Sequence, residues 1–158
     1  MHANAFGFGI SSKFFKNFFD KVEEALKDFE FSPCYKVDFI YGMRDCNKED
    51  ILTIANLKSL WGQGIEEPKI VFEEISVSSN NILLMSPDKN PTIKILLPNG
   101  ISCIKFKSSK EEFETLKPSD TGCIMLNIVG RCSVNDWDNS PQILIEDYEI
   151  AKVQKYYF

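Results

Sequence analysis

The sequence predicts an α+β fold in which a small α/β unit is followed by a compact antiparallel β-barrel. Residues 1–57 alternate between strand-like and helix-like periodicity. Residues 70–158 instead contain short strand-like runs that are separated by turn-rich segments. Between them, residues 58–69 are irregular, because glycines and a proline interrupt every periodic pattern. We therefore expect one domain at residues 1–57, a hinge at residues 58–69 and a barrel domain at residues 70–158.

The first unit is expected to contain two strands and two helices. The strands are predicted at residues 4–10 and 35–41, and the second helix begins after Asn47, a good N-terminal cap. Residues 13–29 form the first helix, because their apolar side chains recur every three or four positions. These side chains are Phe14, Phe15, Phe18, Phe19, Val22, Ala25, Leu26 and Phe29.

The second unit is expected to be mostly strand. The predicted strands are residues 70–77, 82–85, 92–97, 101–106, 123–132 and 142–150. One short helix is predicted at residues 109–116. Five or six short strands with one small helix are typical of a compact barrel, and the OB-fold is a common solution of this kind.

The composition limits the classes of function. The net charge is -5, and the acidity is spread along the chain. A protein whose whole surface grips DNA needs many basic side chains to neutralise phosphates, so only a local basic groove is compatible. No apolar run reaches the ~20 residues of a membrane span, and no signal peptide is visible.

The cysteines indicate a reducing compartment. There are five of them and none form a CxxC pair, which argues against a disulfide framework and favours the cytoplasm. A zinc site is not expected, because its ligands usually come in closely spaced pairs and His2 is the only histidine. Cys103, Cys123 and Cys132 lie in predicted strands and are expected to be small core residues.

Three segments, in this order, resemble the C-terminal half of RecJ-type single-stranded-DNA exonucleases. Residues 2–7, His-Ala-Asn-Ala-Phe-Gly, resemble the Gly-Gly-His-x-x-Ala-x-Gly signature of the DHHA1 domain. Residues 61–68, Trp-Gly-Gln-Gly-Ile-Glu-Glu-Pro, resemble the FGxGNPEP linker that precedes the OB domain. Residues 135–137 with residues 141–150 resemble the final hairpin of the family. The resemblance therefore covers nearly the whole chain.

The resemblance implies an activity for a parent enzyme. Such enzymes degrade single-stranded DNA from the 5′ end in recombination and repair, with Mg²⁺ or Mn²⁺ held by a DHH domain. That domain is not found in this sequence, and Met1 stands where the signature has a glycine. Two-metal chemistry needs converging carboxylates and imidazoles, which one histidine and scattered acidic residues do not supply. We therefore expect a truncated chain that holds no metal and is inactive alone.

The resemblance also implies a phosphate contact near the N-terminus. The family's matching histidine contacts substrate phosphate, which assigns this role to His2, with Asn4 and Gly7 allowing close backbone approach. The alternative is that His2 belongs to a frayed terminus without a role.

In the barrel, several side chains are candidates for contacting DNA. Those expected to meet phosphates are Lys94, Lys105, Lys107 and Arg131, and those expected to stack on bases are Phe106 and Trp137. On a strand, Lys105 and Lys107 would share one face and Phe106 the other. The same pattern also describes a core phenylalanine between two solvated lysines, and Trp137 is equally able to cover one end of the barrel.

The hinge also has two interpretations. Trp61, Gly62, Gly64 and Pro68 either form a packed bend between domains, which we favour, or place Trp61 beside the DNA path. The acidic runs at residues 111–114 and 146–149 are expected to be solvated faces that repel DNA.

The sequence thus favours weak, salt-dependent binding of single-stranded DNA. The alternative is a protein-interaction module that docks on the catalytic domain or on single-strand-binding protein and never touches DNA. The net charge of -5 favours that alternative.

Overall fold

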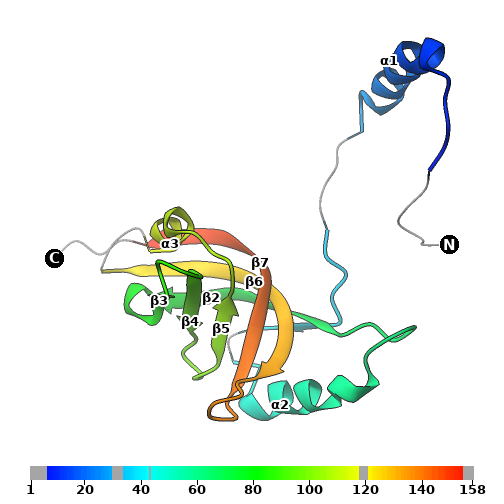
Figure 1. Ribbon diagram of the computed structural model, residues 1–158. Coiled ribbons are helices and arrows are strands. Elements are labelled where there is room, and N and C mark those ends of the chain that lie inside the picture. The colour runs from blue at the N-terminus through cyan, green and yellow to red at the C-terminus, as the bar shows by residue number, and fades with distance from the viewer. Residues whose placement is uncertain (1–6, 30–33, 43, 118–120, 155–158) are drawn as a thin grey trace. The chain divides into compact units, whose positions relative to one another are not determined.

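Figure 1 shows the computed structural model, which describes residues 7–29, 34–42, 44–117 and 121–154. The chain separates into two compact units, residues 1–34 and residues 35–158. No helix among the described residues is long and apolar enough to cross a membrane.

The first unit contains one amphipathic helix. A 3₁₀ turn, η1 (Ser12–Phe14), leads into α1 (Phe15–Leu26), which confirms most of the helix predicted at residues 13–29. Within the described part of this unit no helical side chain is buried, so the helix keeps its apolar face exposed. Its phenylalanines pack on one another, with ring centroids 4.8 Å apart for Phe15 and Phe19. Residues 7–10 have no regular structure, and the rest of the strand predicted at residues 4–10 lies outside the described residues.

The second unit is built on one seven-stranded sheet of mixed direction. Its order is β1-β2-β6-β7-β5-β4-β3. The strands are β1 (Phe39–Tyr41), β2 (Lys69–Ser78), β3 (Ile82–Met85), β4 (Thr92–Leu96), β5 (Ser102–Lys105), β6 (Cys123–Val134) and β7 (Pro141–Gln154). Every strand predicted after residue 69 is present, and the predicted α+β class is confirmed.

The strands β2 and β3 are almost continuous in the chain. Only the short turn η3 (Ser79–Asn81) separates β2 from β3. The two therefore act as one bent strand, which pairs with β6 in its first half and with β4 in its second. β5 pairs in parallel with β7, and α3 (Lys110–Leu116) lies between β5 and β6 in the chain. This connectivity makes the sheet OB-like, because it curls back toward its own first strand.

Alternation along the strands fills the interior. Ile95, Cys103, Ile143 and Cys132 lie opposite one another on successive strands and are all buried. The same face of the sheet carries most of the other large core side chains. These include Ile70, Phe72, Ile75, Val77, Ile82, Ile93, Ile124, Leu126 and Ile128.

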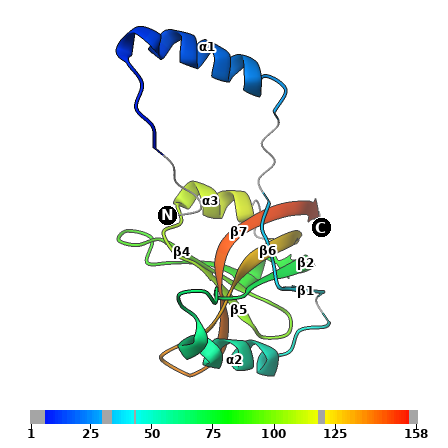
Figure 2. The same cartoon turned by 90° about the vertical axis from the view of Figure 1, so that its right-hand side faces the viewer.

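The helix α2 (Lys48–Asn56) packs on β6 and β7 (Figure 2). Its predicted cap is confirmed: the Asn47 side chain accepts from the Asp50 N–H at 2.9 Å, and the Asp50 carboxylate accepts from the Asn47 N–H. Ile51 is fully buried in the barrel core.

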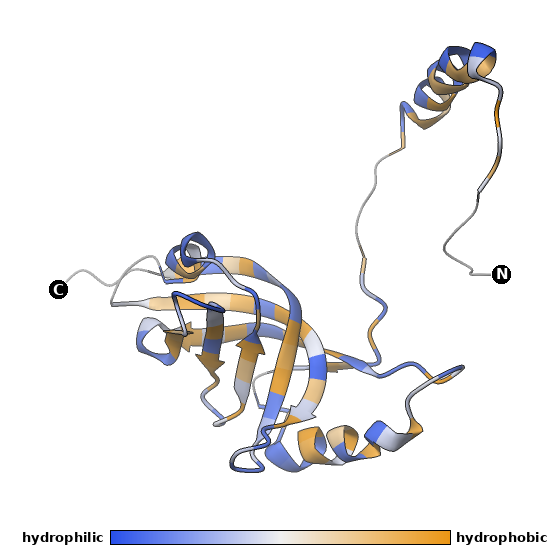
Figure 3. Ribbon diagram, viewed as in Figure 1, coloured by the Kyte–Doolittle hydropathy of each residue, from blue (hydrophilic) through white to orange (hydrophobic). Residues whose placement is uncertain are grey.

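The observed boundary between the units differs from the one expected at residue 57. β1 pairs in parallel with residues 70–72 of β2, and α2 shares the barrel's core. Residues 35–57 consequently pack with the barrel, and the segment expected to be a hinge lies inside one unit. Figure 3 shows hydrophobic residues along the barrel strands and along α2, and those that are buried form one shared core.

Candidate nucleic-acid interface

One row of side chains crosses the outside of the barrel. The register places Lys69, Arg131, Leu144, Ile104 and Lys94 opposite one another on β2, β6, β7, β5 and β4. Strand alternation places these five on the face opposite the core residues Ile95, Cys103 and Cys132. Ile104 is itself covered on that face, with only 6% of its surface exposed. We call this set the outer row. Leu144 and Ile104 form its apolar middle, and cations stand at both ends.

At one end of the outer row the cations are paired. The Arg131 Nη1 donates to Glu67 at 3.0 Å, and its Nε lies 2.7 Å from Glu146, in the geometry of an ion pair rather than a hydrogen bond. Lys69 Nζ lies 2.8 Å from the other oxygen of Glu146. Two carboxylates therefore balance two cations, and the predicted phosphate ligand Arg131 has its charge neutralised within the protein.

At the other end Lys94 is half-buried and makes no ion pair with the part of the chain that the structure describes. It lies close enough to Asp138 to help hold the pKa of that carboxyl below its usual range. The main causes are hydrogen bonds from Ser140, whose N–H donates to Asp138 at 2.9 Å. Asp138 belongs to the hairpin between β6 and β7, so Lys94 interacts electrostatically with that hairpin.

Trp137 stands at the tip of that hairpin. Its side chain is 97% exposed, so it does not cover the end of the barrel, which removes one of the two interpretations drawn from the sequence. The hairpin has a defined shape, since the Trp137 N–H donates to Asn135 and Asn139 adopts a φ of 54°. An exposed indole on an ordered turn is suited to stacking.

The expected pairing of Lys105 and Lys107 on one strand face is wrong. β5 ends at Lys105, and Lys107 has a φ of 56°, so strand alternation does not continue through residue 107. Lys105 instead lies 3.6 Å from Glu112 of α3, with its amine 5.9 Å from the ring centre of Tyr148. Burial and a hydrogen bond with Glu112 raise the pKa of Tyr148. Lys105 thus ties α3 to the barrel.

Phe106 and Lys107 are presented by a fixed turn. Ser108 is buried, its N–H donates to the Pro91 carbonyl at 2.9 Å, and its hydroxyl donates to the Lys105 carbonyl at 3.0 Å. Phe106 is 58% exposed, so it is not the core phenylalanine that the alternative interpretation required.

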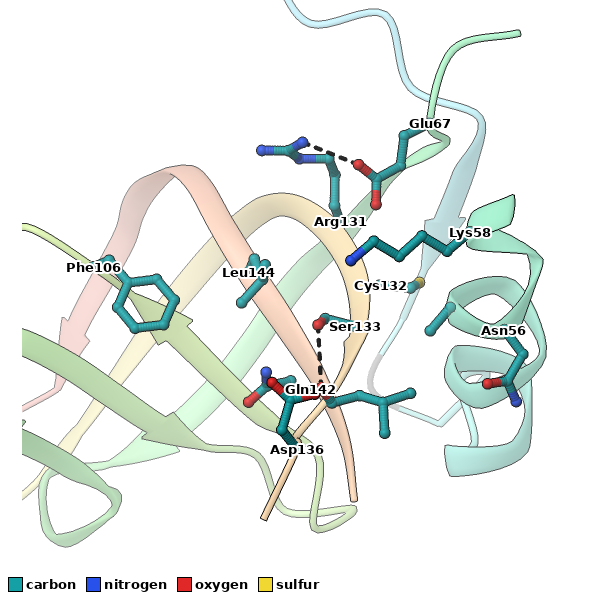
Figure 4. A pocket seen from close by; sticks show the side chains of 12 residues that line it. Asn56, Lys58, Glu67, Phe106, Arg131, Cys132, Ser133, Asp136, Gln142 and Leu144 are labelled. Atoms are coloured by element: carbon teal, nitrogen blue, oxygen red, sulfur yellow. Dashed lines mark hydrogen bonds and ion pairs between the residues drawn. The ribbon is translucent and has the colours of Figure 1, made fainter. Parts of the chain in front are cut away.

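A cavity of about 680 Å³ lies beside the middle of the outer row (Figure 4). Phe106 and Leu144 form an apolar wall, and Arg131, Lys58 and Glu67 line it as well. The remaining lining residues come from α2 and from the two long strands with their hairpin. They are Ala55, Asn56, Cys132, Ser133, Val134, Asp136 and Gln142.

The sequence reasoning missed Lys58, Gln142 and Leu144. Gln142 and Leu144 were within a predicted strand, and their i, i+2 spacing already places them on one face. Lys58 follows α2 directly, in η2 (Leu57–Leu60), and no local pattern relates it to strands more than 70 residues away.

The glycine-rich segment near Trp61 forms a tight loop. Gly62 and Ile65 exchange backbone hydrogen bonds of 2.9 and 3.2 Å, and Gly64 has a φ of 92°. Trp61 and Pro68 are half-buried. A shallower cavity of about 490 Å³ runs from Trp61 to the paired end of the outer row. Trp61 is therefore neither fully packed nor freely exposed, and both interpretations of it remain.

The N-terminal candidates stay a prediction. His2 and Asn4 lie outside the described residues, and Gly7 is exposed with nothing within 4 Å of the place where a Cβ would stand. Among the residues that the structure describes, no group of three His, Cys, Asp or Glu side chains is arranged to hold a metal ion.

Two of the three cysteines that were predicted to be core residues are buried. Cys103 and Cys132 are buried, whereas Cys123 is half-buried. Burial raises the pKa of Cys132 to about 12 and raises that of Cys103 as well, so both remain protonated thiols at neutral pH.

Comparison with known proteins identifies the relatives. No family model matches the chain. The SPbeta prophage-derived protein of Bacillus subtilis named as the single-strand DNA-specific exonuclease YorK is 27% identical over 157 residues, which cover 98% of this chain and 27% of that relative. The single-stranded-DNA-specific exonuclease RecJ of Bacillus subtilis is 25% identical over 138 residues, which cover 84% of this chain and 16% of RecJ.

A solved structure agrees with these sequences. The crystal structure of RecJ in complex with Mn²⁺ from Thermus thermophilus superposes on 96% of this chain with a TM-score of 0.59 and 13% identity. The chain is RecJ-like. The resemblance drawn from the sequence motifs is therefore confirmed, and the chain spans about a quarter of the length of the first curated relatives it matches. This RecJ-like chain covers 22% of the Thermus protein.

Proposed function

We propose that this RecJ-like chain is the part of a single-stranded-DNA exonuclease that holds the DNA strand. The observation that carries the proposal is the open end of the outer row on this OB-like barrel. There Lys94 makes no ion pair within the described residues, and the β6–β7 hairpin, whose Asp138 interacts with Lys94, presents the exposed Trp137. In OB-folds, the strands that correspond to β4 and β5 and the loop that corresponds to the β6–β7 hairpin bind oligonucleotides. The names of the relatives supply the substrate class.

The proposed contacts divide into phosphates and bases. Lys94 and Lys107 neutralise phosphates, and Trp137 and Phe106 offer faces on which unpaired bases stack. These are a few groups on a protein whose net charge is -5, so binding is local and sensitive to salt. Hydrolysis belongs to Mg²⁺ or Mn²⁺ held by another part of the exonuclease, because the described residues of this chain do not fit a metal.

The binding proposal is tested by fluorescence anisotropy with a labelled single-stranded oligonucleotide at low salt. Reversing two charges, Lys94→Glu with Lys107→Glu, is expected to weaken binding about tenfold or more and to reduce the salt dependence, since each lost phosphate contact lowers the slope of log K against log salt by about 0.7. The matched control reverses the charges of Lys110 and Lys152, again by substitution with Glu. Both lysines are exposed elsewhere on the barrel unit. An equal loss in both double variants, or no binding by the wild type, overturns the proposal.

We also propose that the chain by itself does not cut DNA. The purified chain is expected to leave a labelled single strand intact in the presence of Mn²⁺ or Mg²⁺. Metal-dependent shortening of the strand, abolished by a chelator, would contradict this expectation.

A second candidate is a docking module for the rest of the exonuclease or for single-strand-binding protein. It is favoured by the net charge of -5 and by the neutralised cations at the paired end of the outer row. It predicts no oligonucleotide binding at low salt, together with a stable complex with one of those proteins in analytical ultracentrifugation.

A further inference from the structure

The cavity beside the outer row is built from three parts of the chain that lie far apart in sequence. Asn56 and Lys58 come from the end of α2 and from η2, Phe106 comes from the turn after β5, and Ser133 and Gln142 come from the two long strands. The cavity volume of about 680 Å³ falls in the range of pockets that receive small molecules. The cavity can therefore enclose part of a ligand, which a flat strand surface cannot do.

The apolar wall of the cavity is preorganised. The turn that presents Phe106 is ordered: Lys107 adopts a φ of 56°, and Ser108 is held by hydrogen bonds to Pro91 and Lys105. Leu144 also lines the cavity, and Figure 4 labels it together with Phe106. The ring is more than half exposed, so it is accessible to a flat ligand, and the ordered turn beneath it lowers the entropy cost of stacking.

The polar wall carries groups that match a base edge. Gln142 has an amide that both donates and accepts, and it makes no side-chain hydrogen bond with the described part of the chain. The Asp136 carboxylate accepts, as an exocyclic amine of a base requires. In contrast, Arg131 is occupied by Glu67 and Glu146 and contributes no free charge.

One unpaired cation reaches the cavity. Lys58 is exposed, makes no ion pair within the described ranges, and in Figure 4 its side chain extends from η2 toward Arg131. A single lysine beside an aromatic and amide-lined cavity suits a ligand with one flat uncharged part and one anionic part. A nucleotide has this composition.

We propose that this cavity receives one unstacked base of the DNA strand. In this arrangement, which rests on the proposed function, the base stacks on Phe106, its edge meets Gln142 and Asp136, and an adjacent phosphate meets Lys58. A base in a duplex is covered by its neighbours and paired at its edge, so it does not enter without being flipped out. The cavity therefore favours single strands over duplexes, independently of the metal-bearing part of the exonuclease.

The test compares an ordinary single-stranded oligonucleotide with a base-free oligomer of the same length that keeps only deoxyribose and phosphate. Phe106→Leu keeps an apolar side chain but removes the ring. It is expected to weaken binding of the ordinary oligonucleotide about tenfold, as loss of one base–aromatic stack does, and to leave binding of the base-free oligomer unchanged. Phe106→Tyr, which retains the ring, is expected to bind like the wild type.

Two controls separate the outcomes. Phe39→Leu changes another exposed phenylalanine, on β1 (44% exposed against 58% for Phe106), and is expected to have no effect on either ligand. Lys58→Gln is expected to lower the salt slope by about 0.7 for both ligands, whereas Lys110→Gln is not. If the wild type binds DNA but Phe106→Leu behaves like Phe39→Leu, the base site and the Phe106 stack are wrong, and DNA binding through Lys94, Lys107 and Trp137 stands. If the wild type binds no DNA, both are wrong.

Discussion

The two ends of the outer row contain the same kinds of residue but differ in their surroundings. At the paired end, Arg131 and Lys69 stand within 3.0 Å of Glu67 or Glu146. At the open end, Lys94 makes no ion pair within the described ranges and interacts with Asp138 of the hairpin that carries the exposed Trp137. A basic residue on a barrel strand is therefore informative about nucleic acid only after its neighbours are known. Arginine at the paired end stabilises the protein, and lysine at the open end remains available.

The largest expected effect breaks the paired end itself. Gly130 precedes Arg131 at a bulge in β6, and a Cβ there would stand 2.4 Å from the Leu144 carbonyl oxygen and 2.7 Å from Ile143. Gly130→Ala is expected to lower the free energy of unfolding by about 3 kcal/mol, because the neighbouring atom is backbone and gives way poorly. Urea denaturation measures this loss. Gly62→Ala, where nothing lies within 4 Å of the new Cβ, is the control and should change stability far less.

An intermediate effect separates stability from binding. Arg131→Gln leaves Glu67 and Glu146 without their shared cation, and we expect a loss of about 1 kcal/mol, the scale of two partly exposed ion pairs. Oligonucleotide affinity should change little. Lys94→Gln should do the reverse, weakening DNA binding with little effect on the unfolding midpoint. If both variants lose the same DNA affinity, the claim that only the open end of the outer row binds DNA is wrong.

The smallest expected effect has the opposite sign for stability. Lys107 holds a φ of 56°, a conformation that glycine adopts more easily than lysine. Lys107→Gly is expected to raise the free energy of unfolding by about 0.5 kcal/mol while reducing DNA affinity, because relief of backbone strain exceeds the added chain entropy. Thermal unfolding and anisotropy on the same sample check the two parts. Lys89→Gly, at an exposed position without a positive φ, should give no stabilisation.

Local sequence patterns predicted the elements of the fold well. The strands after residue 69, the helix at Ser109–Leu116 and the Asn47 cap all depend on alternation, turn residues or capping, which are properties of neighbouring residues. The boundary at residue 57 was different, because β1 and α2 join the barrel through a parallel pairing and a buried isoleucine that no local pattern encodes.

The candidate site was predicted less completely for the same reason. Lys94, Phe106 and Trp137 were recognised as residue types, and the structure leaves all three available to a ligand. The neutralisation of Arg131 was not visible, since Glu67 lies 64 residues away in sequence. Lys105 was assigned to a shared face with Lys107 because a strand was expected to extend one residue further than it does.

The short strand β1 has a consequence for how this protein can be shortened. It occupies the free side of β2 at residues 70–72, the stretch where the first barrel strand has no other neighbour on that side. Cutting the chain in the glycine-rich loop near Trp61 would uncover a row of backbone donors and acceptors beside apolar side chains. Other chains can pair with such an exposed edge strand, and the shortened protein would therefore aggregate. The smallest well-behaved version of the barrel therefore starts before Phe39.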